Sequence, residues 1–133
     1  MKLEIITLTK TINDENIDFV SLEGTEGSLG ILPDHIPMLA ELKLAPLHYL
    51  KGGRTEFVAV MGGVVRVLSN VVTIITEEAE KAVEIDALKA QKEKDDAEAY
   101  MSRKTEIADM VRAEAQLRKA MAKLRTVEVS KRI

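Results

Sequence analysis

Residues able to perform acid–base or metal chemistry are few in this chain of 133 residues. It contains two histidines, His35 and His48, and no cysteine. Asp34 adjoins His35, but a metal site needs three or four convergent ligands, and no pair of histidines or cysteines has metal-binding spacing. No Gly-x-Ser-x-Gly elbow of a serine hydrolase occurs either. The sequence therefore predicts no catalytic residue and no metal site, and we expect His35 to shape a loop or meet a partner.

A second candidate for chemistry is the segment GTEGSLGILPDHIP at residues 24–37, which holds three of the seven glycines and two of the three prolines. Glycines can surround a phosphate, but a P-loop ends in Lys-Ser or Lys-Thr and leads into a helix. This segment leads instead into Pro33 and Pro37, which fix their own backbone and restrict the residue before them. It predicts a shaped turn between strands.

Charge is unevenly distributed along the chain, whose formal net charge is −3. Residues 1–80 carry 6 basic and 12 acidic side chains, whereas residues 81–133 carry 13 and 10. Between residues 118 and 133 there are six basic side chains and one acidic side chain. Such a segment can attract an acidic partner or nucleic acid, or it can simply complement a helix dipole. With only 3% aromatic residues, base-stacking platforms for nucleic acid are not expected.

The elements that must position these residues fall into two parts, because every glycine and proline precedes residue 64. In the first part, β-rich runs cover residues 3–9, 17–23, 28–32, 42–50, 55–61, 64–68 and 71–76. Residue pairs 52–53, 62–63 and 69–70 are typical of hairpin turns. The run at 55–61 is apolar on both faces, which suits a strand buried between two sheets. We therefore predict an antiparallel β-sandwich over residues 1–83.

The second part, residues 84–133, is rich in helix-forming Ala, Lys, Glu, Leu and Met. Apolar residues at helical spacing predict two helices that pack antiparallel through the seams Ala87, Ala90, Ala97 and Met101, and Met110, Ala113, Leu117, Ala120, Leu124 and Val127. Alanine seams bury little apolar surface, so this hairpin should be marginally stable. The bend at 101–105 contains no Gly or Pro, and one extended helix is an alternative state. The predicted class is α+β, a sandwich followed by a helical hairpin.

The phrase G-x-x-G-x-L-G-I-x-P-x-H-x-P at residues 24–37 resembles the signature of the epsilon subunit of bacterial F-type ATP synthases. Weaker matches follow in order through Lys51-Gly52-Gly53, Val60-Met61-Gly62-Gly63, Asn70-Val71-Val72-Thr73-Ile74 and Arg118-Lys119-Ala120-Met121. The resemblance covers essentially the whole chain. It implies a non-catalytic rotor subunit of the central stalk, which couples ion translocation through the membrane to ATP synthesis.

The resemblance also implies partners. The sandwich would grip the gamma subunit and rest on the ring of c subunits through residues in the signature segment, namely Glu26, Ser28, Pro33, His35 and Pro37. Many members have Glu where this chain has Ser28, and Glu26 could substitute for it. The helices would fold on the sandwich, or extend toward the alpha and beta subunits and inhibit ATP hydrolysis through a basic helix containing Arg118, Lys119, Lys123 and Arg125.

Some members of the family bind regulatory ATP on the folded hairpin through an Ile/Leu-Asp-x-x-Arg-Ala motif. The corresponding residues here are Glu80, Asp86, Lys89, Ala90, Lys119 and Lys123. Lysine replaces the arginines and lacks the planar fork that holds phosphate with two hydrogen bonds, so any ATP site should be weak or absent. Asp86 is equally explained as a helix N-cap. No other cofactor is expected.

By this resemblance the chain lies at the cytoplasmic face of the cell membrane, attached only through the complex. Uncharged runs such as residues 57–65 are far shorter than the roughly 20 apolar residues of a membrane-spanning helix. Two other classes remain open at this point, a free adaptor that binds an acidic protein or nucleic acid, and a small enzyme. Co-purification with gamma and c subunits separates the adaptor from the rotor subunit, and turnover by the isolated chain would support the enzyme.

Overall fold

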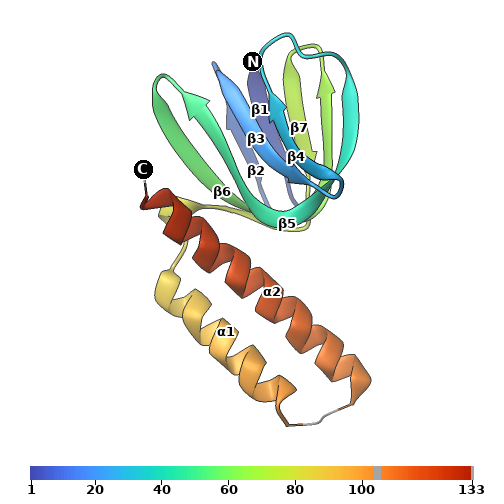
Figure 1. Cartoon of the computed structure of the whole chain (residues 1–133), viewed down its shortest axis with the longest axis vertical. Helices are drawn as coiled ribbons and strands as arrows, with labels where there is room; N and C mark the ends of the chain where they lie inside the picture. The colour runs from blue at the N-terminus through green and yellow to red at the C-terminus, as the bar shows by residue number, and fades with distance from the viewer. Residues whose placement is uncertain (104–105, 133) are drawn as a thin grey trace.

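The computed structural model describes residues 1–103 and 106–132. A β-sandwich occupies one end, and two antiparallel helices lie beneath it (Figure 1). The strands are β1 (Lys2–Ile6), β2 (Thr11–Asp14), β3 (Phe19–Gly24), β4 (Gly27–Ile31), β5 (Met38–Lys51), β6 (Arg54–Leu68), β7 (Val71–Ile75) and β8 (Ala79–Lys81). A 3-10 turn, η1 (Ala82–Glu84), leads to α1 (Ala87–Met101) and α2 (Ile107–Ser130). The predicted sandwich and helical hairpin are confirmed, and the boundary expected after residue 83 falls within η1.

One sheet forms both layers of the sandwich. Its strand order is β2-β1-β7-β6-β5-β3-β4, and β8 also pairs with β6. β5 and β6, of 14 and 15 residues, bend at mid-length and so contribute to both layers (Figure 1). We call the layer with β3, β4 and β8 the helix-side layer, and the layer with β7, β1 and β2 the open layer. Side chains from both layers, such as Tyr49, Val58, Leu3 and Ile74, form one buried core.

The bend of β6 lies at Gly62 and Gly63, and here the sequence-based prediction of a hairpin turn is wrong. β6 continues without interruption from Arg54 to Leu68. Both glycines have positive φ, 78° and 106°, as in a turn. The same backbone freedom allows a strand to turn a corner, and at this corner β6 changes its pairing partner from β8 to β7. The pairs 52–53 and 69–70 do connect strands as expected.

Two further features differ from the expectation. β1 and β7 pair in parallel, whereas all other strand pairs that the structure describes are antiparallel. Two strands, β2 and β8, were not predicted, because they are only four and three residues long and largely polar. Chain order does not specify which edge of a sheet an N-terminal strand joins, so local patterning could not reveal the parallel pair.

The helices pack through the predicted alanine seams. Ala90 and Ala97 of α1, and Ala113 and Ala120 of α2, are all at most 6% exposed. Part of the predicted bend, residues 104–105, lies outside the described residues. Within the described chain, neither helix is long and apolar enough to cross a membrane. A seam of alanines buries few methylene groups, so the contact between the helices should contribute little stability per residue.

A buried polar staple joins β2 of the open layer to β5 of the helix-side layer. The hydroxyl of Tyr49, whose residue is fully buried, donates a hydrogen bond of 3.0 Å to Asp14, and the Lys51 ammonium pairs with the same carboxylate. Burial alone would raise the pKa of Asp14, but the hydrogen bonds from Lys51 and Tyr49 and the charge of Lys51 hold it below its ordinary value. Burial and the bond to Asp14 raise the pKa of Tyr49.

Removing this staple should lower stability in a pH-dependent way. Because the folded-state pKa of Asp14 is lowered, its contribution is present at neutral pH and is lost as pH falls below about 4. Tyr49→Phe should cost about 1 kcal/mol at pH 7. Asp14→Asn should destabilise the chain at pH 7 and flatten its acid dependence, as measured by urea unfolding between neutral and acidic pH. Glu15→Gln, which removes the next carboxylate, serves as the control and should retain the wild-type acid dependence.

Candidate functional site

The two histidines make structural contacts, one with aromatic rings and one within a loop. The ring of His48 lies between the rings of Phe57 and Phe19, with centroids 5.5 Å and 6.3 Å away. His35 stands in the loop between β4 and β5, where its Nδ1 donates to the carbonyl oxygen of Ile36 at 2.7 Å. Within residues 1–103 and 106–132, no three His, Cys, Asp or Glu side chains gather in a way that could hold a metal ion.

The signature residues expected to meet partners fall into two groups at opposite ends of β4. Glu26 lies at the tip of the β3–β4 hairpin, and Ser28 follows it and bonds both carboxylate oxygens of Glu23 at 3.2 Å. Pro33, His35 and Pro37 belong instead to the loop that follows β4. They therefore do not form a single patch with Glu26 and Ser28, although most of them are exposed.

The loop after β4 is hydrogen-bonded to the β6–β7 turn of the open layer. Its turn is fixed at Asp34, which has a positive φ of 64°. The Asp34 amide donates a 2.9 Å hydrogen bond to the side-chain oxygen of Asn70, in the β6–β7 turn. The exposed side chains of Leu32 and Ile36 flank this turn. Because both prolines and this bond restrict the backbone, the loop presents a fixed shape to a partner.

The outer face of the open layer carries exposed apolar side chains, and sequence reasoning missed them. Strand alternation also places Lys2, Glu4, Glu41 and Arg66 on this face. Five large side chains there are between 36% and 73% exposed: Ile6, Leu39, Val64, Leu68 and Ile75. Strand register places Val64 opposite Ile75 and Ile75 opposite Ile6, so these three form one row across β6, β7 and β1. The sequence did indicate apolar side chains on both faces of these strands, because most residues of 64–68 and 71–76 are apolar. The same pattern also fits a strand that is buried on both faces, so it did not predict an exposed apolar surface.

The outer face of the helix-side layer is also apolar, yet it is covered. Ala122 of α2 packs on Ala59 and Met61 of β6, with Leu44 and Ile85 beside them. This explains why residues 55–61 are apolar on both faces: one face forms the sandwich core and the other lies under α2. Among residues 1–103 and 106–132, no helix covers the outer face of the open layer.

The four predicted basic residues of α2 point in two directions. Lys119 and Lys123 face the segment before and within β8, where Lys119 pairs with Glu77 at 2.6 Å and Lys123 with Glu78 at 2.9 Å. Lys123 also lies 3.6 Å from Glu80. The Lys123 side chain is only 15% exposed. Its burial would lower its pKa, but the hydrogen bond to Glu78 and the charges of Glu78, Glu80 and Glu93 raise it.

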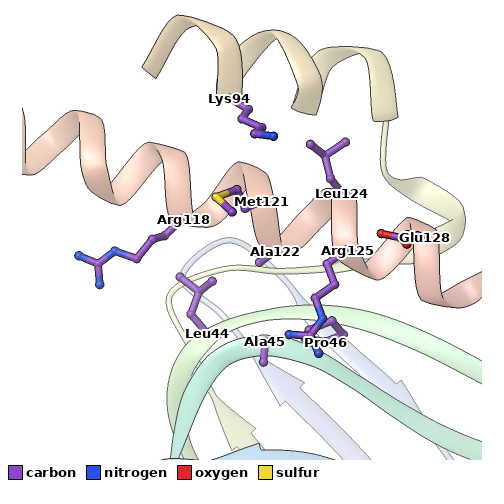
Figure 2. A pocket seen from close by; sticks show the side chains of 10 residues that line it. All are labelled: Leu44, Ala45, Pro46, Lys94, Arg118, Met121, Ala122, Leu124, Arg125 and Glu128. Carbon is purple, nitrogen blue, oxygen red and sulfur yellow. The ribbon is translucent and has the colours of Figure 1, made fainter. Parts of the chain in front are cut away.

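Arg118 and Arg125 lie on the other side of α2, beside β5. A groove of about 460 Å³ lies between α2 and the bend of β5. Figure 2 shows Arg118 and Arg125 on the side of α2 that faces β5, with Met121 between them, whereas Leu124 points toward Lys94 of α1. Arg118 pairs with Glu114 on its own helix at 3.3 Å. Two of the basic residues of α2, Lys119 and Lys123, therefore pair with carboxylates of the sandwich segment. The other two, Arg118 and Arg125, lie on a different side of the helix beside apolar side chains.

The residues proposed to bind ATP are only partly brought together. Glu80 and Lys123 are in contact, as described above. Asp86 accepts a 3.1 Å hydrogen bond from the Lys89 backbone amide, which is the predicted N-cap. The Lys89 side chain is exposed, and Ala90 is buried at 2% exposure in the seam between the helices.

Comparisons with known proteins agree with this architecture. Residues 1–82 match the family model "ATP synthase, Delta/Epsilon chain, beta-sandwich domain", and residues 83–128 match the "long alpha-helix domain" of the same chain. The ATP synthase epsilon chain of Nitratidesulfovibrio vulgaris is 42% identical over 94% of this chain and 93% of its own length. That of Syntrophobacter fumaroxidans is 40% identical over 96% of each.

Solved structures give the same result. A chain in the Euglena gracilis mitochondrial ATP synthase structure of OSCP, F1 and c-ring superposes with a TM-score of 0.75, at 25% identity over 90% of this chain and 76% of that one. A chain in the Tetrahymena thermophila central stalk and c-ring shares the fold at 15% identity, with a TM-score of 0.59. Because the family models, the bacterial relatives and the fold all agree over nearly the full length, the chain belongs to the family of ATP synthase epsilon chains.

Proposed function

We propose that this chain is a rotor subunit of the central stalk whose sandwich docks on the gamma subunit and c-ring, and whose helical hairpin restrains ATP hydrolysis. The single observation that carries the docking is the row of exposed apolar side chains on the outer face of the open layer, which neither α1 nor α2 covers in the part of the chain that the structure describes. Faces of this kind mark sites of protein association. As an ATP synthase chain it is part of a membrane-associated complex. In our proposal, this complex lies at the cell membrane, with the chain on the cytoplasmic face.

The loop after β4 and the β3–β4 hairpin provide two further contacts for the rotor. The loop presents Pro33, His35 and Pro37 on a backbone that is held by the bond to Asn70. The hairpin presents Glu26 and the carboxylate of Glu23, which Ser28 orients. Glu23 therefore supplies an acidic group directly opposite Ser28 on the neighbouring strand. These residues suit a partner loop that carries a basic side chain.

The hairpin suits the role of a movable restraint. Its packing on the sandwich consists mainly of small or flexible side chains such as Ala122, Ala59 and Met61. Such a contact buries little surface, so a partner can replace it at modest cost in free energy. The side chains of Arg118 and Arg125 are exposed on α2, where they can pair with acidic groups of the catalytic subunits.

Removing the hairpin tests this proposal. A chain that ends at Glu84 keeps every strand of the sandwich, and we expect it to bind the rotor while raising ATP hydrolysis by the reconstituted complex about fivefold or more. The measurement is steady-state hydrolysis by the complex with each form bound in equal amount. A matched full-length variant, with Arg118→Gln and Arg125→Gln, should release part of the same inhibition. If hydrolysis is unchanged while both forms remain bound, the hairpin is not an inhibitor.

A further inference from the structure

Five charged residues hold α2 against the end of the sandwich, and we call them the latch: Glu77, Glu78, Glu80, Lys119 and Lys123. The three carboxylates come from the short segment between β7 and the end of β8, and the two lysines come from successive turns of α2. The distances are 2.6 Å, 2.9 Å and 3.6 Å, so each lysine has an opposite charge within direct reach.

The latch surrounds Lys123 with negative charge on more than one side. Glu78 and Glu80 approach it from the sandwich, and Glu93 approaches it from α1. The side chain is 15% exposed, in contrast to the 64% of Arg118 on the same helix. Lys123 is therefore less screened by water than Arg118, and separating it from its carboxylates without a new partner would leave a largely buried charge uncompensated.

This arrangement does not fit a nucleotide. A triphosphate would have to approach Lys119 and Lys123, which stand where ATP-binding members of the family carry arginines, but these lysines pair with Glu77 and Glu78. The carboxylates of Glu77 and Glu78 would repel the phosphates, and lysine offers no two-pronged hydrogen bond to compensate. Asp86 is likewise engaged as the cap of α1.

The apolar contact beside the latch is small. Ala122, one residue before Lys123, reaches Ala59 and Met61 with a side chain of one carbon. Leu44 and Ile85 complete this small apolar cluster, and the ion pairs of the latch act beside it. Screening by salt weakens them, because the screening length falls from about 10 Å at 0.1 M to about 3 Å at 1 M.

We propose that in this chain the folded hairpin is held by its own carboxylates in place of a bound nucleotide, so that it opens with ionic strength or an acidic partner and does not respond to ATP. The effect of this opening on ATP hydrolysis rests on the proposed function, whereas the latch itself can be measured in the isolated chain. When α2 leaves, Lys119 and Lys123 become free to bind the acidic groups of a partner, so the two states compete for the same two cations.

A single introduced thiol in the isolated full-length chain tests the latch. The chain has no cysteine, and Ala122 is 6% exposed on the side of α2 that faces the sandwich, so Ala122→Cys should react with a maleimide only when α2 undocks. We expect the reaction to accelerate roughly threefold to tenfold between about 0.05 M and about 1 M NaCl, and by a similar factor at low salt when Lys123→Gln is added. ATP with magnesium should not slow it.

Two matched controls separate the latch from general loosening. Ala113→Cys is equally buried, at 6%, but lies between the two helices, so its reaction rate should not follow salt. Arg132→Gln removes an exposed charge just after α2, outside the latch, and it should leave the Ala122→Cys rate unchanged. An Ala122→Cys reaction rate that changes neither with salt nor on adding Lys123→Gln would overturn the proposal. Slowing of the maleimide reaction by ATP would overturn it as well. Neither result depends on whether the hairpin inhibits hydrolysis.

Discussion

Gly63→Ala is expected to destabilise the sandwich severely. A β-carbon built at Gly63 would lie 2.0 Å from the carbonyl oxygen of Ile75 and 3.0 Å from the α-carbon of Thr76. These are backbone atoms of the neighbouring strand, so no side chain can rotate away, and β6 would have to separate from β7 at its corner. The substitution should cost several kcal/mol, a large part of the roughly 5–15 kcal/mol that stabilises a domain.

Gly62→Ala is the matched control, because it tests backbone strain without the clash. Gly62 also has a positive φ, but the nearest atom to its added β-carbon is the carbonyl oxygen of Leu42 at 3.6 Å, an ordinary contact. This variant should lose only about 1–2 kcal/mol. Urea unfolding followed by circular dichroism gives both values. If Gly62→Ala and Gly63→Ala lowered the free energy of unfolding equally, the close contact with the Ile75 carbonyl would not be the reason that this corner needs glycine.

The two glycines also show where sequence reasoning about the fold ends. Positive φ is correctly anticipated from a Gly-Gly pair, but a hairpin turn and a corner within a long strand both need it. The choice depends on whether residues 64–68 continue the pairing with β5 or begin a new hairpin, and that is settled by register over the whole sheet. Periodicity did predict the two helices and their alanine seams, because both depend on local spacing alone.

Prediction of the candidate site succeeded where a motif is contiguous and failed where a surface is assembled from several strands. The signature segment and the capping role of Asp86 are local, so the sequence indicated them. The row of Val64, Ile75 and Ile6 depends on pairings across three strands, one of them parallel, which no local pattern specifies. Likewise, the division of the basic residues of α2 into two sides appears only once Glu77 and Glu80 are placed beside the helix.

Charge on the outer face of the open layer should abolish docking on the rotor. Ile75 lies at the centre of the apolar row and is 56% exposed, so Ile75→Glu changes that face without placing a charge in the core. In a complex, the new carboxylate would lose its water without gaining a partner. A buried uncompensated charge at the centre of an interface costs 2 kcal/mol or more, so the affinity should fall by at least about 30-fold.

Leu88→Glu is the matched control for this change. Leu88 is 85% exposed on α1, away from the open layer, and its replacement introduces the same charge in place of an exposed apolar side chain. It should leave docking unaffected. Circular dichroism of both variants checks that the sandwich remains folded, which we expect because neither side chain contributes to the buried core.

The most direct test of the central claim is the affinity of the full-length chain for the assembled gamma subunit and c-ring, measured by surface plasmon resonance for the wild type, Ile75→Glu and Leu88→Glu. A chain that docks through the open layer should bind tightly as wild type and as Leu88→Glu, and should bind at least about 30-fold more weakly as Ile75→Glu. Undiminished binding by a correctly folded Ile75→Glu variant would contradict the claim that this face joins the chain to the rotor.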